Sequence, residues 1–321
     1  MHILIIGAAG MLGQKLVQRL ATGATVLGRA VTRLTRHDAV LCLPPPDTAY
    51  PVDTLMGDIA GAAEAGVLVQ EKPDVIFHLA AIVSGEAEED FDKGYRINLD
   101  GTRYLLDAIR AIPGYRPRLV FTSSIAVFGQ PFPDAIDDTF FTTPLTSYGT
   151  QKAMCELLIS DYTRRGFVDG LALRMPTVCV RPGKPNKAAS GFFSNIIREP
   201  LVGKEAVLPV DDTVRHWHVS PRSAISQLLH AASLDTNLLG NRRAISMPGL
   251  SCTVKEQIEA LVKVAGPDIA KRIRHEPDAR IAGIVAGWPR NFNPQRARDL
   301  GFKSESTFEE IIRVHIEDER T

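Results

Sequence analysis

The sequence has few of the features that place a protein outside the cell or in a membrane. Four of its 321 residues are cysteine, and their spacing matches neither a metal site nor a redox pair: Cys42, Cys155, Cys179 and Cys252. Scattered thiols of this kind are typical of a reducing compartment. Apolar runs such as 75–83 are too short to span a bilayer, and residues 1–6 do not resemble a signal peptide. We therefore expect a cytoplasmic protein with no membrane partner.

An excess of charge of either sign is also lacking. The 37 Lys and Arg residues are balanced by 37 Asp and Glu residues, so the formal net charge is zero. Because nucleic acids and anionic surfaces are bound through a basic excess, we expect no nucleic-acid partner and a small-molecule ligand instead. Hydrophobic residues make up 45% of the chain. That fraction allows one large or two smaller domains.

The N-terminal segment predicts a strand, a glycine turn and a helix. The apolar run 3–6 stops at a glycine, and from Leu12 the apolar residues recur with helical spacing. This layout brings backbone amides and a helix N-terminus against a pyrophosphate, which favours a dinucleotide site over an ordinary tight turn. The predicted cofactor contacts are Gly7, Ala9, Gly10, Met11, Leu12 and Gly13.

The adenosine end of this site is less well defined. A second strand near 31–34 should end where an acidic residue binds the ribose hydroxyls, but Thr35 and Arg36 follow it. Asp38 takes that role from a displaced position, or Arg36 accepts the 2′-phosphate of NADP, or these are solvated loop residues. The sequence leaves the three interpretations open. A third strand ends just before Asp58, which we expect beneath the adenine.

Two further strands carry polar residues at or beyond their ends. The fourth strand begins near Asp74 and runs into small residues, with Ser84 in a loop that could reach a substrate. His78 lies within this apolar run and is interpreted as a core histidine. The fifth strand, 119–121, ends in three hydroxyl residues at the edge where ligands bind in open parallel sheets. Of these, we expect Ser124 to be catalytic, with Ser123 as the second candidate.

A tyrosine and a lysine four residues apart begin the helix predicted over 147–165. Tyr148 and Lys152 share one face of that helix. A charge about 4 Å from the phenol supplies roughly the 4 kcal/mol needed to use tyrosine as a base near neutral pH. The pair alone is weak because it arises by chance, and its weight comes from the glycine turn and the strand-end hydroxyls.

The last third of the sequence departs from strand and helix alternation. After a sixth strand, 171–174, and the polar loop 181–187, we expect a smaller domain. Thr253 and Glu256 form a capping box that predicts a helix ending at Gly266. The fold class is therefore α/β: a doubly wound parallel sheet, with a smaller C-terminal α+β domain.

Taken together, these motifs resemble the extended short-chain dehydrogenases/reductases, the NAD-dependent epimerase/dehydratase family. The resemblance implies a Rossmann domain over 1–177 and 215–243, and a substrate-binding domain over 178–214 and 244–321. Blocks at 148–159, 166–170 and 181–189 are similar to family members that oxidise the C2 hydroxyl of a four-carbon sugar acid with NAD. Such an aldonate is the expected substrate.

The family resemblance also implies roles for individual residues. Tyr148 becomes the proton acceptor, Lys152 lowers its pKa and holds the nicotinamide ribose, and Ser124 fixes the substrate oxygen. The remaining matches are an ordering asparagine, adenine contacts, a phosphate wall and the nicotinamide pocket: Asn98, Asp58, Ile59, Leu79, Ala80, Ala81, Pro176 and Thr177. The departure at Thr35 and Arg36 leaves NADP possible.

A sugar acid needs a cation for its carboxylate. Arg215 matches an arginine that nucleotide-sugar relatives direct at a phosphate, and we expect it to anchor the carboxylate, with Lys184 and Asn186 nearby. The alternative for Arg215 is an interdomain salt bridge. His216 and His218 share a strand face, but two ligands without a third do not make a metal site, so we expect none.

Two other functions stay open on sequence grounds. A nucleotide-sugar epimerase or dehydratase would use the same residues and retain its cofactor, and a dinucleotide-sensing regulator would share the fold but need no base. The family resemblance further implies a homodimer formed through the helices over 91–112 and 147–165.

Overall fold

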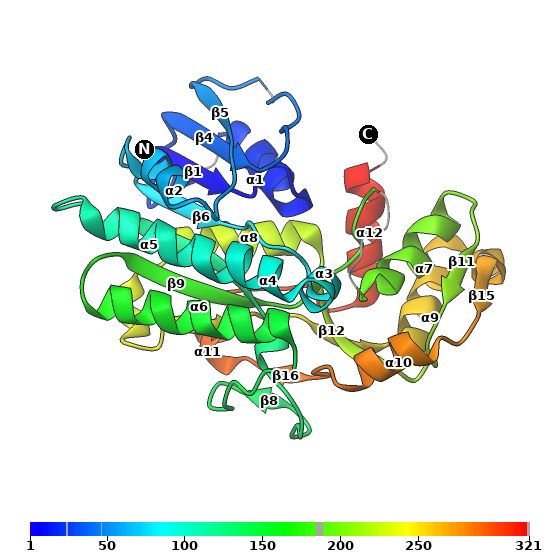
Figure 1. Ribbon diagram of the computed structural model, residues 1–321. Helices are drawn as coiled ribbons and strands as arrows, with labels where there is room; N and C mark the ends of the chain where they lie inside the picture. The colour runs from blue at the N-terminus through cyan, green and yellow to red at the C-terminus, as the bar shows by residue number, and fades with distance from the viewer. Residues whose placement is uncertain (24, 46, 184–188, 320–321) are drawn as a thin grey trace.

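The computed structural model describes residues 1–23, 25–45, 47–183 and 189–319, and among these seven parallel strands form the central sheet. The strand order is β13-β9-β7-β6-β1-β4-β5. The strands are β1 His2–Ile6, β4 Arg33–Asp38, β5 Val52–Met56, β6 Val75–His78, β7 Arg118–Ser124, β9 Asp169–Met175 and β13 Ala244–Ser246. This Rossmann-type α/β sheet confirms the predicted fold class (Figure 1).

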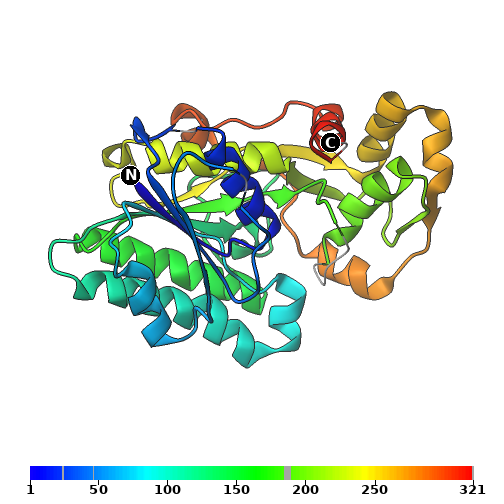
Figure 2. The ribbon, with the colours of Figure 1, turned by 90° about the horizontal axis from the view of Figure 1, so that it is seen from above.

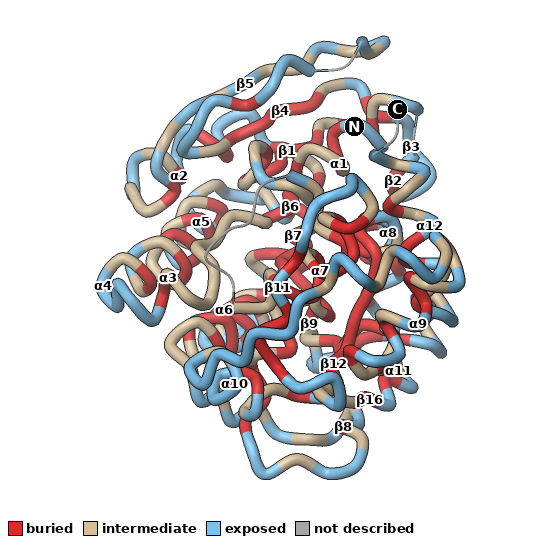
Figure 3. The backbone as a smooth tube through the Cα atoms, turned by 90° about the vertical axis from the view of Figure 1, so that its right-hand side faces the viewer, coloured by how far each residue is buried: buried red, intermediate tan, exposed pale blue. Residues whose placement is uncertain are grey.

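Helices cover both faces of the sheet because its strands are apolar on both sides. In β1, Ile3 and Ile5 face α1 and α8, whereas Leu4 and Ile6 face the opposite helices. Figure 2 shows α8 on one side of the sheet and α5 and α6 on the other. The covering helices are α1 Met11–Ala21, α2 Ala62–Val69, α5 Gly101–Ala111, α6 Ser147–Arg164 and α8 Pro221–Ser233. The central strands are buried along most of their length (Figure 3).

A smaller part lies at the right of Figure 1 and has its own hydrophobic core. Its helices are α7 Gly191–Leu201, α9 Val254–Ala265, α10 Ala279–Ala286 and α12 Phe308–Glu319. Its strands are β10 Thr177–Val178, β11 Ala206–Leu208, β12 Arg215–Val219, β14 Leu250–Thr253 and β15 Ile273–His275. The capping box of Thr253 and Glu256 is present at the start of α9, and Gly266 ends this helix, as predicted.

Short elements complete the chain. They are β2 Thr25–Val26, β3 Arg29–Ala30, β8 Ile136–Asp137, β16 Phe292–Asn293, α3 Ser84–Glu89, α4 Phe91–Gly94 and α11 Gln295–Asp299, with a π-helical turn over Tyr95–Asp100 and 3₁₀ turns over Ile125–Val127, Thr236–Leu239 and Pro267–Arg272. The helix predicted over 91–112 is therefore interrupted at the π-turn. Of the helices in the described ranges, none is both long and apolar enough to cross a membrane.

Two limits drawn from the sequence differ from the structure. The second strand of the sheet, β4, runs from Arg33 to Asp38 and so continues four residues past the predicted end at Leu34. Residues 244–246, predicted in the smaller domain, form β13 and pair with β9. The core packed on the sheet also includes Phe302 from the C-terminal part. The division into two domains stays a prediction, but its boundary at 243 assigns the whole of β13, a strand of the large sheet, to the smaller domain.

Candidate active site

In the glycine turn between β1 and α1, close contacts with neighbouring backbone leave no room for a side chain at two of the glycines. Gly7 has a φ of +91°, and a Cβ there would lie 2.5 Å from the Ala80 nitrogen at the end of β6. A Cβ on Gly13 would overlap the Gly7 carbonyl. Gly10 differs: its φ is −70°, and its nearest neighbour would be 3.4 Å from a Cβ. A side chain at Gly10 would fit the protein but would fill the space in front of the turn.

The N-terminus of α1 is suited to an anion. Gly10 is its N-cap residue, and within the described chain no side chain caps this end and no acidic residue lies in its first turn. The first amides of the helix therefore point toward the space that Gly10 leaves open. Leu12 of this turn lines a pocket shared with Tyr148 and Lys152. These features fit the pyrophosphate of a dinucleotide.

Asp38 lies where the ribose end of a dinucleotide site is expected. This residue ends β4, and its carboxylate accepts hydrogen bonds from the amides of Ala9 at 2.9 Å and Val40 at 3.2 Å. Arg36 lies inside the strand with 5% of its surface exposed and donates to the Leu43 carbonyl and the Thr54 hydroxyl. Thr35 is buried on the other face of the strand, so the predicted placement of Thr35 and Arg36 at the strand end is wrong.

The predicted adenine residues follow β5. The Asp58 carboxylate pairs with Arg96 at 2.5 Å, and this hydrogen bond holds the pKa of Asp58 below its usual value. Ile59 is buried. Beyond β6, Leu79 and Ala81 line the pocket, while Ala80 packs against Gly7. These positions surround the path that a dinucleotide would take from the turn to the pocket.

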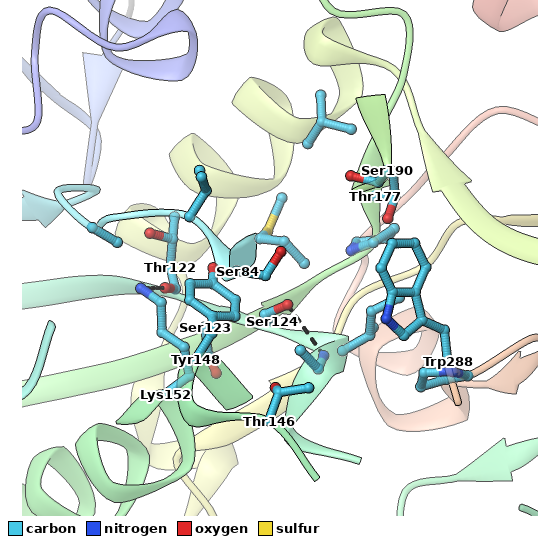
Figure 4. A pocket seen from close by; sticks show the side chains of 18 of the residues that line it. Ser84, Thr122, Ser123, Ser124, Thr146, Tyr148, Lys152, Thr177, Ser190 and Trp288 are labelled. Atoms are coloured by element: carbon cyan, nitrogen blue, oxygen red, sulfur yellow. Dashed lines mark hydrogen bonds between the residues drawn. The ribbon is translucent and has the colours of Figure 1, made fainter. Parts of the chain in front are cut away.

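The pocket has a cavity volume of about 270 Å³ and lies beyond the carboxyl ends of β6, β7 and β9. Residues from several elements line it, and those predicted from the sequence include Ser84, Ser124, Tyr148, Lys152, Pro176 and Thr177. Figure 4 shows Tyr148, Lys152 and Ser124 together at one side of it. The structure therefore gathers the predicted catalytic side chains in one place.

The two candidate serines, Ser123 and Ser124, differ in the groups that their hydroxyls contact. Ser123 is buried, and its hydroxyl donates to the Glu156 carboxylate at 2.5 Å. Glu156 also pairs with Arg174 at 2.8 Å. Ser124 accepts a hydrogen bond from the Ala126 amide and lies beside Tyr148 (Figure 4). Ser124 thus has its hydroxyl beside Tyr148, whereas Ser123 also lines the pocket but its hydroxyl is hydrogen-bonded to Glu156 and joins β7 to α6.

The electrostatics of Tyr148 differ from the expectation. Burial raises its pKa, and the opposing influences are the charge of Arg181 and interaction with the Ser124 hydroxyl. Lys152 is 2% exposed, and its ammonium donates to the Thr122 carbonyl at 2.8 Å and lies 5.7 Å from the centre of the Tyr148 ring. Burial lowers the pKa of Lys152 to about 8. Lys152 is close to Tyr148, but the cation that opposes the rise of the Tyr148 pKa in this structure is Arg181.

Asn98 acts at a distance from the pocket. It lies in the π-turn with 2% of its surface exposed. Its side-chain oxygen accepts from the Ile82 amide at 2.9 Å, and its nitrogen donates to Gln151 of α6 at 2.7 Å. Asn98 therefore ties the segment after β6, which lines the pocket, to the helix that carries Tyr148 and Lys152.

The predicted carboxylate anchor is not in the pocket. Arg215 pairs with Glu256 at 3.2 Å, is 39% exposed in its side chain, and is not among the described residues that line the pocket. The prediction for Arg215 is therefore wrong, and the salt-bridge alternative describes its contacts. Lys184 and Asn186 lie outside the described residues. Arg181, which lines the pocket, was not selected from the sequence, although it begins the polar loop that was.

Three histidines are neutral structural residues. His78 contacts Thr102 at 3.0 Å, and burial lowers its pKa to about 3, which confirms it as a core histidine. His216 lies between Thr177 and Pro289, and His218 contacts Gln257. In the described part of the chain, no group of three His, Cys, Asp or Glu side chains is placed to hold a metal ion.

A parallel sheet with a dinucleotide turn beside a serine, tyrosine and lysine pocket defines a nicotinamide-dependent oxidoreductase of the short-chain type. The chain belongs to the NAD dependent epimerase/dehydratase family, whose model matches residues 3–220.

Relatives over the full length carry two different descriptions. The chain is 47% identical to D-erythronate dehydrogenase of Cupriavidus necator, over 99% of this chain and 98% of the relative. It is 42% identical to the D-erythronate dehydrogenase of Haemophilus influenzae, over 99% of both chains. A solved structure from Agrobacterium tumefaciens, described as a nucleoside-diphosphate-sugar epimerase, is 62% identical with a TM-score of 0.97, covering 100% of this chain and 94% of that one.

Proposed function

We propose that this protein is an NAD-dependent dehydrogenase that oxidises the C2 hydroxyl of a four-carbon sugar acid, D-erythronate, to 2-dehydro-D-erythronate. The observation that supports this most directly is that a partly buried arginine, Arg181, lines the same small pocket as Ser124 and Tyr148. A guanidinium pairs with a carboxylate bidentately, and in D-erythronate the carboxylate is one bond from the reacting carbon. The two full-length relatives named D-erythronate dehydrogenase support this substrate.

The mechanism assigns one task to each pocket residue. Arg181 holds the C1 carboxylate and Ser124 donates a hydrogen bond to the C2 oxygen. Tyr148 accepts the proton of the C2 hydroxyl as that oxygen becomes a carbonyl. Such proton transfer typically contributes about 100- to 10,000-fold. When bound, NAD supplies the acceptor for the C2 hydride.

Lys152 contributes its position and its charge. Its ammonium is fixed by the Thr122 carbonyl, and with a pKa of about 8 it is largely charged at neutral pH. As a donor in the same volume, this ammonium suits the hydroxyls of a nicotinamide ribose, while the charge of Arg181 opposes the rise of the Tyr148 pKa.

Preference for NAD over NADP rests on Asp38. A carboxylate at the end of β4 accepts hydrogen bonds from two ribose hydroxyls and repels a 2′-phosphate. Arg36 is occupied by Leu43 and Thr54 inside the strand, so it is not placed to compensate that repulsion. We therefore propose NAD as the cofactor.

A nucleotide-sugar epimerase or dehydratase is the second candidate, because the 62% identical structure is described as an epimerase. The pocket argues against it. Its volume of about 270 Å³ lies just below the roughly 300–1,000 Å³ of ligand pockets, which suits a four-carbon acid better than a nucleoside diphosphate sugar. A dinucleotide-sensing regulator is less well supported, since a sensor has no use for Tyr148 in the pocket.

One assay separates these functions. The purified protein is mixed with NAD or NADP and a panel of four-carbon aldonates, and the absorbance of the reduced nicotinamide is followed. We expect continuous NADH formation with D-erythronate and at least tenfold lower kcat/KM with NADP. Interconversion of a nucleotide sugar without net NADH would replace this proposal with the epimerase.

Three broader assignments are proposals from the sequence. They are a cytoplasmic location, a division into dinucleotide-binding and substrate-binding parts, and a homodimer formed through the α4–α5 segment and α6. For the dimer, support comes from Leu157 on α6, which is 71% exposed.

A further inference from the structure

The segment Gly287–Trp288–Pro289 closes the pocket from the C-terminal part of the chain. It follows α10 and precedes β16, and all three of its residues line the pocket. Figure 4 shows Trp288 across the pocket from Tyr148, with Ser124 between them. The mechanism uses the Tyr148 side of the pocket and assigns nothing to this wall.

His216 fixes the position of this wall. Its Nδ1 donates to the Pro289 carbonyl at 3.1 Å, and its Nε2 accepts from the Thr177 hydroxyl at 2.7 Å. Burial lowers the pKa of His216 to about 4, so the ring is neutral and one nitrogen donates while the other accepts. The ring stacks on Phe193 with centroids 5.1 Å apart and lies 5.2 Å from Trp288.

Trp288 is also held from its own helix end. Its amide donates to the carbonyl of Val285, the buried residue of α10. This hydrogen bond fixes the backbone of Trp288, and the contact with the His216 ring limits where its indole can lie. The wall opposite Tyr148 therefore has a set position.

The geometry points to Trp288 as the residue that sets the length of the substrate's carbon chain, with His216 as its positioning residue. The inference rests on the proposed function. With C2 at Tyr148 and Ser124 and the C1 carboxylate at Arg181, the rest of the chain extends into what remains of a cavity of about 270 Å³. Trp288 bounds that space, so five- and six-carbon aldonates meet the indole.

The test compares chain lengths in one variant and a matched control. Trp288→Ala should raise kcat/KM for six-carbon relative to four-carbon aldonates at least tenfold, because one methylene in a fitted pocket is worth about 10- to 200-fold. Trp217→Phe should leave this ratio within about twofold. Trp217 is not among the described pocket residues; its indole donates to the Met247 carbonyl and packs on Phe292.

His216 is tested by the same ratio. His216→Phe keeps a ring between Phe193 and Trp288 but removes both hydrogen bonds, so the preference for four carbons should relax. His216→Asn retains a donor for Pro289 and should restore most of that preference. A purely structural role would lower stability in both variants without moving the chain-length ratio.

A fluorescence measurement serves if Trp288→Ala does not fold. The chain has two tryptophans, so Trp217→Phe leaves Trp288 as the sole indole. With Tyr148→Phe added to slow NADH formation at least about 100-fold, its emission should change when D-erythronate is added to the NAD-bound protein, and an unchanged emission at saturating substrate contradicts the inference. If the wild type oxidises no aldonate, the proposed function fails. If it oxidises D-erythronate but Trp288→Ala keeps the wild-type ratio, only the inference fails.

Discussion

Arg181 and Arg215 differ in what their guanidinium groups face. Arg181 lines the pocket and its charge acts on Tyr148, whereas Arg215 is exposed and paired with Glu256. Hydrogen bonds to a charged group are worth about 1.5–3 kcal/mol. An exposed ion pair contributes about 0–1 kcal/mol.

Arg181→Met should therefore raise the KM for D-erythronate about 10- to 100-fold and leave the NADH Kd unchanged. The control Arg215→Met should change both within about twofold. Steady-state kinetics and NADH titration measure the two quantities. A larger rise of KM in the Arg215 variant than in the Arg181 variant would show that Arg215, and not Arg181, binds the substrate carboxylate.

We expect the buried charge of Lys152 to lower the free energy of unfolding of the protein. A pKa lowered from 10.5 to about 8 by burial corresponds to roughly 3 kcal/mol of destabilisation. This penalty is fully present below pH 8, where both states hold the proton, and it is lost between about pH 8 and 10.5, where the folded state gives up its proton before the unfolded state does.

Lys152→Met should be inactive yet more stable by about 1–2 kcal/mol at pH 7, after the cost of leaving the Thr122 carbonyl unpaired. Urea unfolding from pH 7 to pH 10 measures the difference, which should shrink with rising pH. A variant less stable than the wild type at pH 7 would mean that the buried ammonium is well compensated.

The sequence predicted residues whose geometry follows from local spacing. Tyr148 and Lys152 lie close together because they are four residues apart on one helix. The conformation of the glycine turn is likewise determined by the seven residues from Gly7 to Gly13. Arg181 was missed because its direction depends on how the chain after β10 packs against α7. The end of β4 was predicted four residues too early, at Leu34 instead of Asp38. The length of this strand is set by its pairing with β1 and β5 and not by its own composition.

At the level of elements, α6 is held close to the end of β7. The Thr146 hydroxyl caps the helix by accepting from the Gly149 amide at 3.0 Å. Gly149 packs so closely on the turn after β7 that a Cβ would overlap the Ala126 carbonyl. Further along α6, Glu156 accepts a hydrogen bond from Ser123 of β7 and pairs with Arg174 of β9, which holds the helix against the sheet. The separation of Ser124 and Tyr148 therefore depends on the absence of a side chain at Gly149.

Gly149→Ala should lower the unfolding free energy by about 1–3 kcal/mol through overpacking and lower kcat by displacing Tyr148. Gly66→Ala is the control, because Gly66 lies in α2 with open space at its Cβ. That change should be neutral or stabilising by up to about 1 kcal/mol. Thermal unfolding and kcat distinguish the two, and a fully active Gly149→Ala enzyme would show that the close approach is dispensable.

In the whole molecule, the pocket lies where the sheet's core meets the core of the smaller part. Tyr148, Lys152 and Ser124 come from the first, and Trp288 from the second. The α6 surface opposite the sheet carries Leu157 and Met154, which are 71% and 38% exposed. Apolar residues on an exposed helix face suit an interface between copies of the chain.

Leu157→Glu should convert the proposed dimer into a monomer, because a buried unpaired carboxylate is costly at an interface. Light scattering coupled to size exclusion reads the mass directly. Leu41→Glu, at a residue 80% exposed in the segment after β4, should leave the mass unchanged. A wild-type protein that is monomeric at all concentrations would remove the dimer proposal.

The role of Tyr148 is tested most directly by single-turnover NADH formation from D-erythronate in the wild type and in Tyr148→Phe. With NADH affinity unchanged, the phenylalanine enzyme should be slower by at least about 100-fold. A rate near that of the wild type would contradict the assignment of Tyr148 as the proton acceptor.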